Sequence, residues 1–309
     1  MKADLERIKL QHPSMDDLEG VIQFMIECDT AEFGEADTDA DDVADQWRET
    51  DLSTDAWIAR DGESRLIGYA LLSGESNNRR YIDLYTHATR SPEGMVAVLL
   101  DRLVERFNEH ALAGDSTDGC LLTAYANGFN KSQCAAYDAH GFEIEKYHYR
   151  MQMDFDSEQP AQDWPRGVTL SPYTEADERA LFDLIIETFD WLGVPPFPFD
   201  VWQKQIFRGG RFDPEMFLML KQDGVLSGAA LCYNEGFRLW LKELAISKRL
   251  QGTGLGSKLL KQVFYEAQKR GVPSVALGVV SQNPKACAFY EHAGMTRTRE
   301  FVQYKKLAG

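Results

Sequence analysis

The sequence contains an internal repeat, and this repeat restricts the possible folds more than any other feature. With a shift of 160 residues, the segment L-I-G-Y-A-L-L from Leu66 aligns with L-S-G-A-A-L-C from Leu226. Further along, the shift becomes 153, and N-K-S-Q-C-A-A-Y from Asn130 aligns with N-P-K-A-C-A-F-Y from Asn283. Self-similarity at a nearly fixed spacing indicates that one structural unit occurs twice. We therefore expect two domains of the same kind within the 309 residues.

Each half shows the same expected order of elements. A strand is followed by a pair of helices, two or three antiparallel strands, a strand ending in a tight turn, a long helix, and a closing strand, helix and strand. This order predicts an α/β fold of the mixed α+β layered type, with a central, mostly antiparallel sheet flanked by helices in each domain. Residues 154–167 are polar, contain two prolines and lack periodicity, which predicts a linker. The expected domains are residues 1–158 and 159–309.

A glycine-rich turn in the second half is expected to open a helix. Residues 237–246 are rich in aromatic and branched apolar residues and predict a strand, while apolar residues recur at helical spacing from Leu255 to Ala267. The turn between them includes Q-G-T-G-L-G-S at 251–257. Amide groups at a helix N-terminus lack partners and carry the positive end of the helix dipole, so this turn predicts a phosphate site. It is neither a Walker loop nor a dinucleotide fingerprint, because Ser257 stands where both require glycine.

A second pattern follows this helix. An apolar strand expected at 275–280 precedes the segment S-Q-N-P-K-A-C-A-F-Y-E-H-A-G-M. Asn283 before a proline is typical of a helix N-cap, and Gly294 suits the end of that helix. Capping gives no reason for Tyr290, which stands four residues before the glycine, nor for the order of strand, glycine turn, helix, strand and capped helix.

The two patterns together resemble the GCN5-related N-acetyltransferase (GNAT) family. They are Gln251-x-x-Gly254-x-Gly256 and the later residues Asn283, Tyr290 and Gly294-Met295. The repeat extends the resemblance to nearly the whole chain, which looks like a tandem of two GNAT domains. The resemblance implies that acetyl-CoA is the acyl donor and that no metal is required. The residues that it assigns to the cofactor are Leu244, Ala245, Ile246, Gln251, Gly252, Thr253, Gly254, Leu255, Gly256, Ser257 and Asn283.

The resemblance implies acetyl transfer to an amine by direct attack within a ternary complex. An alkylammonium with a pKa near ~10 must first lose a proton, and Glu243 is the candidate base. Tyr290 resembles the tyrosine with which the family protonates the departing thiolate. An ion pair with Lys242 or Arg238 is the alternative role for Glu243, and a core position beside Phe289 is the alternative for Tyr290.

The acceptor site is expected in the first helices of the second half. Glu187, Asp190 and Trp191 are candidate contacts for a cation. A rigid loop of prolines and aromatic residues is the alternative reading of the same segment. The leading hypothesis is an enzyme, an acetyl-CoA-dependent N-acetyltransferase acting on the primary amine of a small, cationic acceptor. The alternatives are a mycothiol-synthase-like or other acyl-CoA acyltransferase, and a non-catalytic acyl-CoA-binding sensor.

The first half has lost the features of the phosphate turn. The residues aligned with Gln251, Gly252, Thr253, Gly254 and Gly256 are Ser91, Pro92, Glu93, Gly94 and Val96. Proline removes a backbone donor, valine adds a side chain where close approach is needed, and glutamate brings a negative charge toward a pyrophosphate. The first domain is therefore expected to bind coenzyme A weakly or not at all.

Composition limits the possible partners, metal sites and location of the protein. A net charge of −16 disfavours nucleic acid as a partner and would attract small cations, although it also serves solubility. The five cysteines form no C-x-x-C pair and are odd in number, which argues against a zinc knuckle and a disulfide framework. No apolar run approaches the ~20 residues of a membrane helix, so we expect no membrane association and a cytoplasmic location.

Overall fold

The computed structural model describes residues 8–76, 78–113, 119–189, 198–207 and 212–308. The chain forms two compact units. The first unit contains the chain up to Tyr147 together with the C-terminal segment from Phe301, and the second unit contains His148 to Glu300.

The first unit contains the elements of the first repeat and the end of the last strand. Its sheet order is β1-β2-β3-β4-β5-β12, and the beginning of β6 lies beside β12. The elements of the first half are β1 (Lys9–Gln11), the 3-10 helix η1 (Met15–Asp17), α2 (Leu18–Phe33), α3 (Ala40–Glu49), α4 (Leu52–Asp55), β2 (Ala56–Arg60), β3 (Leu66–Ser76), β4 (Arg79–Thr86), α5 (Met95–Ala113), β5 (Leu121–Asn127), α6 (Lys131–Ala139) and β6 (Glu143–Asp154).

The second unit repeats this order. Its sheet runs β6-β11-β10-β9-β8-β7, with all neighbours antiparallel except β10 and β11. The elements of the second half are β7 (Val168–Pro172), η2 (Glu175–Asp177), α7 (Glu178–Phe189), α8 (Phe199–Ile206), η5 (Pro214–Met216), β8 (Phe217–Gln222), β9 (Val225–Asn234), β10 (Leu239–Ile246), η6 (Lys248–Leu250), α9 (Leu255–Lys269), β11 (Ser274–Val280), α10 (Pro284–His292) and β12 (Thr296–Leu307). The predicted mixed fold of two similar domains is confirmed.

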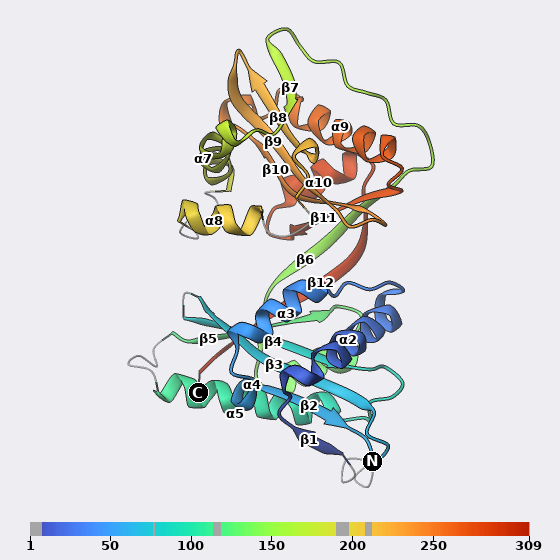
Figure 1. Ribbon diagram of the computed structural model, residues 1–309, viewed down its shortest axis with the longest axis vertical. Coiled ribbons are helices and arrows are strands. Elements are labelled where there is room, and N and C mark those ends of the chain that lie inside the picture. Colours follow the sequence, from blue (N-terminus) through green and yellow to red (C-terminus); the bar gives the residue numbers. More distant parts are fainter. Residues whose placement is uncertain (1–7, 77, 114–118, 190–197, 208–211, 309) are drawn as a thin grey trace. The chain divides into compact units, whose positions relative to one another are not determined.

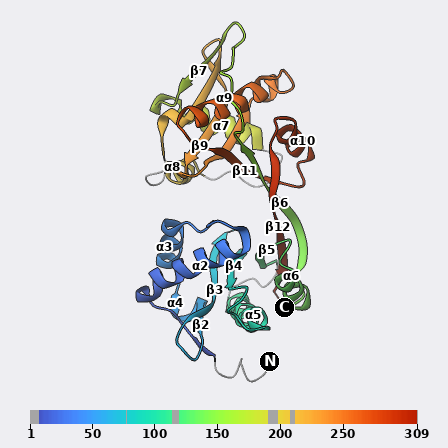
Figure 2. The same ribbon diagram turned by 90° about the vertical axis from the view of Figure 1, so that its right-hand side faces the viewer.

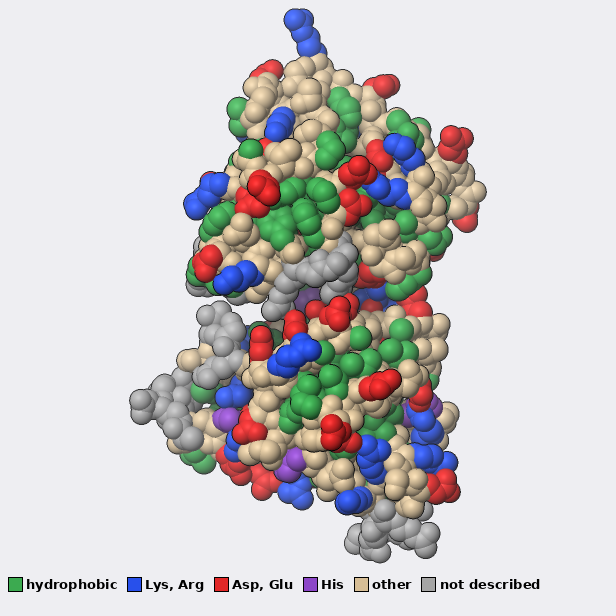
Figure 3. Space-filling view, viewed as in Figure 1, with side chains coloured by type: hydrophobic (Ala, Val, Ile, Leu, Met, Phe, Trp, Pro, Cys, Tyr) green, Lys and Arg blue, Asp and Glu red, His purple; other side chains and the backbone are tan. Residues whose placement is uncertain are grey.

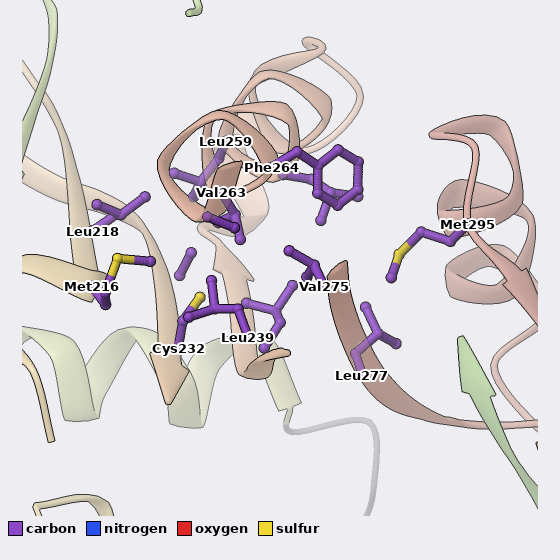
Figure 4. Packing of buried hydrophobic residues seen from close by; sticks show 14 of the residues in the cluster. Met216, Leu218, Cys232, Leu239, Leu259, Val263, Phe264, Val275, Leu277 and Met295 are labelled. Carbon is purple, nitrogen blue, oxygen red and sulfur yellow. The ribbon is translucent and has the colours of Figure 1, made fainter. Parts of the chain in front are cut away.

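Helices cover both faces of the sheet in each unit. In the first unit, α5 packs on one face through Leu99 and Phe107, and α2 and α3 pack on the other through Phe24 and Trp47 (Figure 2). In the second unit, apolar side chains of α9 point toward the strands, as Val263 does toward Leu239 and Val275 (Figure 4). The opposite face carries α7 and α8. Alternation of side chains along each strand supplies apolar residues to both layers.

The repeated glycines of the central strands have a packing role. A Cβ atom added to Gly228 would lie 2.7 Å from Cδ1 of Ile246, and one added to Gly68 would lie 3.0 Å from Cδ1 of Leu99. Carbon atoms in contact normally stay at ~3.5 Å or more. A larger residue at either position would therefore require the neighbouring side chain to move, and glycine lets the two pack closely.

Each unit contains an opening between two parallel strands. β10 and β11 are in register only at Leu239 and Trp240, although β10 continues to Ile246. In the first unit, β4 and β5 are in register from Arg79 to Ile82, although β4 continues to Thr86. Beyond these points, one edge of β10 and one edge of β4 have no ladder partner among the described strands.

The two units exchange their last strands. From His148 onward, β6 pairs with β11 of the second unit, and from Phe301 onward, β12 pairs with β5 of the first unit. The predicted domain boundaries of 1–158 and 159–309 therefore need correction at both ends. Local sequence patterns identify β6 and β12 as strands, but the partner of each strand is chosen by packing between segments far apart in the sequence.

The predicted linker also has a different position. Residues 155–167 contain no helix or strand, as expected, but they lie along α9 within the second unit. The Gln159 amide donates to Oε1 of Gln268, the Gln162 amide donates to Oε1 of Gln262, and Lys258 Nζ donates to the Asp163 carbonyl. The chain passes between the units through β6 and β12 instead.

We expect the C-terminal strand to stabilise the first unit, although it follows the second repeat. Tyr304 is 2% exposed and its ring centroid lies 5.1 Å from that of Tyr137. Tyr304→Ala should lower the free energy of unfolding of the first unit by about 3–5 kcal/mol, because a buried aromatic side chain is lost. Hydrogen exchange followed by mass spectrometry should show loss of protection in β5 and unchanged protection in β8 and β9. Leu307→Ala, at an exposed position of the same strand, is the control. Equal effects of the two variants would contradict the role of β12 in the core of the first unit.

The charged side chains of one face of the molecule are of both signs. On the face shown in Figure 3, Asp and Glu side chains are interspersed with Lys and Arg. None of the described helices is both long and apolar enough to cross a membrane. Within the described ranges, no three His, Cys, Asp or Glu side chains lie close enough together to hold a metal ion.

Candidate active site

The glycine-rich turn opens α9, as the sequence predicts. The N-cap residue is Gly254, and no side chain caps the helix. The Lys258 amide donates to the Gly254 carbonyl at 3.1 Å, which is the first hydrogen bond of the helix. The amides that precede Lys258 therefore lack intrahelical acceptors, and they stand at the positive end of the dipole. The N-terminus of α9 has the geometry of an anion site.

The backbone of the turn requires glycine at two positions. Gly252 has φ 78° and Gly254 has φ 88°, in the left-handed region that side chains disfavour. A Cβ atom at either residue would meet no atom within 4 Å, so space alone does not explain the glycines. Gly256 differs, since its Cβ would lie 3.5 Å from Ile246 and 3.8 Å from Phe289. It joins the start of α9 closely to β10 and α10.

Two side chains hold the turn in place, one against β10 and one against η6. Gln251 Nε2 donates to the Ile246 carbonyl at 3.1 Å, and Thr253 Oγ1 donates to the Leu250 carbonyl at 2.6 Å. Both are predicted cofactor residues, and these contacts give them a positioning role. Their side chains fix the loop that precedes the helix start.

The strand before the turn offers a free edge. From Glu243 to Ile246, β10 pairs with β9 on one side, while its other edge has left β11. The register of β10 on β9 shifts between Leu241 and Glu243, which is a β-bulge. Leu244, Ala245 and Ile246, predicted to contact the cofactor, lie on this edge beside the opening. Unpaired strand amides of this kind can donate to a carbonyl oxygen or an oxyanion.

Glu243 follows the bulge and lies on the face covered by α7 and α8, as does Ala245. Burial raises the pKa of its carboxyl group to about 7, and Lys242 opposes this only in part. No ion pair joins Glu243 to Lys242 or Arg238 in the described structure, where Arg238 instead pairs with Glu235 at 2.6 Å. A carboxyl group that titrates near neutral pH is suited to accept a proton.

Tyr290 lies on α10, and its environment links it to Glu243. Burial raises the pKa of its phenol, and the Glu243 charge raises it further, so the two groups lie within electrostatic reach of each other. The ring also packs at 5.2 Å from Phe289 at the edge of the hydrophobic core. Tyr290 therefore packs beside Phe289, which was the alternative role for this residue, and it also lies within electrostatic reach of Glu243, the candidate base. A protonated phenol can donate a proton to a leaving group.

The contacts of Asn283 and the burial of Cys287 point to roles in structure for both side chains. The Asn283 side chain accepts a hydrogen bond from the Ala286 amide at 3.0 Å and caps α10, so capping accounts for this predicted cofactor residue. The Cys287 thiol is buried, and its pKa is raised by desolvation. Such a thiol is a poor nucleophile.

The predicted acceptor residues are only partly described. Glu187 is exposed at the end of α7, and its Oε1 accepts a hydrogen bond from the Lys248 amide at 3.0 Å. This bond attaches α7 to the segment between β10 and the turn. Asp190 and Trp191 lie outside the described residues.

The corresponding turn of the first unit is arranged differently. The Met95 amide donates to the Pro92 carbonyl at 3.1 Å, and Ser91 Oγ donates to the Ile67 carbonyl. Glu93 is exposed beside these groups. In the second unit an amide of the turn is also used, since the Thr253 amide donates to the Leu250 carbonyl at 3.3 Å. The start of α5 differs by its proline and its negative charge, neither of which occurs in the turn from Gln251 to Ser257.

One acidic residue of the first unit, Asp83, was not among the predicted site residues. Asp83 on β4 stands 160 positions before Glu243 on β10, on the equivalent strand beside the equivalent opening. The shift of 160 residues between the repeats aligns Asp83 with Glu243 and could have identified it. The neighbouring residues differ between the repeats, however, and the turn that follows has a different sequence. β4 pairs regularly with β3 at this point, without the bulge found in β10.

Comparison with known proteins agrees with this geometry. Residues 178–295 match the acetyltransferase (GNAT) family. A mycothiol acetyltransferase from Stackebrandtia nassauensis is 25% identical over 270 residues, which span 81% of each chain. A GCN5-related N-acetyltransferase from Sphaerobacter thermophilus has a TM-score of 0.81 and 23% identity over 97% of this chain and 96% of its own.

The fold similarity extends to both repeats. A tandem GNAT protein from the clavulanic acid biosynthesis pathway has a TM-score of 0.73 and 16% identity, over 98% of this chain and 99% of its own. Residues 178–295 therefore form a domain that matches the GNAT acetyltransferase family, and nearly the whole chain has the fold of tandem GNAT proteins.

Proposed function

We propose that the protein transfers the acetyl group of acetyl-CoA to the primary amine of a small, cationic acceptor by direct attack in a ternary complex. The observation that carries this proposal is the position of Glu243 and Tyr290 within electrostatic reach of each other, beside the free edge of β10. The uncapped start of α9 follows the same strand.

The turn and the strand supply the donor site in this proposal. The pyrophosphate of acetyl-CoA accepts hydrogen bonds from the amides between Gly252 and Ser257, where the helix dipole favours its charge. The pantetheine arm runs along the free edge of β10. The thioester carbonyl then accepts a hydrogen bond from a β10 amide between Leu244 and Ile246.

The chemical step transfers one acetyl group and is accompanied by several proton transfers. Glu243 accepts a proton from the acceptor ammonium, directly or through water, and the freed nitrogen lone pair attacks the thioester carbonyl carbon. The C–N bond forms and the β10 amides stabilise the oxyanion. The C–S bond then breaks, Tyr290 gives its proton to the thiolate of coenzyme A, and the surplus amine proton passes to solvent. The proton held by Glu243 then returns through solvent to the Tyr290 phenolate, which restores both groups. The buried Cys287 has no part in the transfer.

A second candidate is acetylation of a mycothiol-related amine. It is favoured by the mycothiol acetyltransferase of S. nassauensis, whose similarity spans both repeats rather than the GNAT domain alone. A screen of primary amines, including amines related to mycothiol, separates the two candidates by the rate of coenzyme A thiol release. Binding of acetyl-CoA without thiol release for any amine would instead support an acyl-CoA sensor.

The pH dependence of turnover tests Glu243. The folded-state pKa near 7 is raised above the ordinary value of 4.5, so the carboxyl group must lose its proton before it can act as a base. Turnover should rise with pH through about 7 and level off above it. Glu243→Gln should lower turnover by on the order of 10²-fold and remove this inflection. An unchanged inflection in the variant would assign the titration to another group.

The same variant should change stability in a defined direction. Between pH 4.5 and about 7 the folded state retains a proton that the unfolded state has lost, so the free energy of unfolding falls as pH rises through this window. Glu243→Gln should therefore melt at a higher temperature than the wild type at pH 8. Its circular dichroism spectrum provides the control for folding.

A further inference from the structure

The first unit contains a cavity of about 160 Å³ at the opening between β4 and β5. Residues of β4 from Ile82 to Thr86 line one side, and Tyr125 and Ala126 of β5 line the other. Helix α2 adds Asp29 and neighbouring residues, and Phe301 of β12 completes the wall. The cavity therefore occupies the place in this unit that the proposed transfer site has in the second unit.

The cavity wall is acidic and aromatic. Its carboxylate residues are Asp29, Glu32, Asp37 and Asp83. Its aromatic residues are Phe33, Tyr85, Tyr125 and Phe301. No lysine or arginine is among the described residues that line it. The walls thus place carboxylate groups beside aromatic rings.

Two of these carboxylates are held in place and face the cavity. Asp29 is 4% exposed and accepts three hydrogen bonds, all at Oδ2, from the amides of Asp37 and Thr38 and the Thr38 hydroxyl at 2.6–3.0 Å. Asp83 accepts one, at Oδ2, from Gln46 Nε2 at 2.6 Å. Among the described residues, Oδ1 of either side chain accepts none, although both residues line the cavity.

The two carboxylates act on the same part of the cavity. The charges of both Asp29 and Asp83 raise the pKa of the Tyr85 phenol, so both lie within electrostatic reach of that hydroxyl. Burial raises the pKa of each carboxyl group as well, because no cation offsets the lost hydration. A cation in the cavity would supply the missing charge.

We propose that this cavity binds a small organic ammonium ion between Asp29 and Asp83. An ammonium group has three N–H donors. Two of them can bond to the Oδ1 atoms of Asp29 and Asp83, and the third can bond to another acceptor. The aromatic side chains of the wall favour a cation near the faces of their rings. A metal ion fits less well, since no three potential ligands converge within the described structure. The site lies within the first unit and does not depend on acetyl transfer by the second.

The diverged turn of this unit agrees with such a role. The start of α5 has lost the phosphate geometry, whereas the opening beside β4 and an acidic residue at the position of Glu243 persist. The first unit has thus kept the end of the site that receives an amine and lost the end that receives a pyrophosphate. Binding there requires no acyl donor.

Titration calorimetry with n-butylammonium chloride tests the proposal on the full-length protein without acetyl-CoA. Asp83→Asn and Asp29→Asn keep the size of each side chain and an oxygen that can accept the existing hydrogen bonds. Asp45→Asn removes an equal charge from the same unit at a side chain that does not line the cavity. 1-Butanol, of similar size and uncharged, is the ligand control. Glu243→Gln reports on any amine bound in the second unit.

The wild type should bind n-butylammonium at a site whose affinity falls at least about tenfold in Asp83→Asn and Asp29→Asn. The same site should be unchanged in Asp45→Asn and Glu243→Gln, and 1-butanol should not compete for it. Equal affinity in Asp83→Asn and Asp45→Asn would overturn the proposal, as would absence of binding in the wild type. If Asp29→Asn fails to fold, Asp83→Asn decides the result by itself.

Discussion

Full-length protein carrying Gly254→Glu should lose acetyl-CoA binding, whereas the wild type should bind one equivalent. Gly254 caps α9 with φ 88°, so a side chain there strains the turn, and its carboxylate adds a like charge beside the pyrophosphate. Unfavourable like-charge contacts cost several kcal/mol, so affinity should fall by at least about 10²-fold. Titration calorimetry measures both the affinity and the number of sites.

Gly94→Glu is a matched control for this variant. Gly94 has φ 91° before α5 in the first unit, so the substitution brings similar backbone strain and the same charge. It should leave acetyl-CoA binding unchanged, because the turn of the first unit already contains Pro92 and Glu93 and uses the Met95 amide internally. Two binding sites in the wild type, one of them lost in Gly94→Glu, would show that the first unit also binds the cofactor.

Tyr290→Phe should lower turnover by on the order of 10²-fold while acetyl-CoA affinity stays within about twofold of the wild type. The phenol lies within electrostatic reach of Glu243 and belongs to α10, whereas the turn opens α9. Its loss therefore removes a proton donor for the thiolate and leaves the phosphate site intact. Steady-state thiol release gives turnover, and calorimetry gives the affinity.

Tyr137→Phe is the corresponding control in the first unit. Tyr137 is fully buried, and its hydroxyl lies 3.4 Å from Gln133 Nε2 and 3.5 Å from the Tyr125 carbonyl. The substitution removes a buried hydroxyl at the repeat position of Tyr290 without touching the proposed active site. Turnover should remain at the wild-type level. Equal losses in both variants would assign the effect of Tyr290→Phe to packing.

Much of the proposed active site follows from local sequence because its parts are local. The turn from Gln251 to Ser257 follows its strand and opens its helix within one segment, so glycine spacing and helix periodicity locate it. Glu243 is identified because it precedes that turn by a few residues. Asn283 shows the limit of this approach, because the same letter that resembles a family motif also caps α10.

The acceptor side was less accessible to sequence analysis. Glu187 was predicted to contact an acceptor, but its side chain accepts a hydrogen bond from the Lys248 amide. Asp29 and Asp83 were not predicted at all, since 54 positions separate them in the sequence. The cavity that they share arises where α2 packs beside the opening of β4 and β5. The periodicity of residues within one helix or one strand does not reveal which other element packs against it.

Local sequence is enough to predict the two repeats, the order of their elements and the helix that starts after Gly254, and it is the basis for the proposed phosphate site and its proposed loss in the first repeat. These properties follow from backbone preferences and side-chain periodicity over short segments. Only the tertiary structure decided that β6 completes the second sheet and β12 the first. Both strands could satisfy their hydrogen bonds in either sheet, so the choice depends on which sheet edge and core receive them, and that is a property of the folded chain alone.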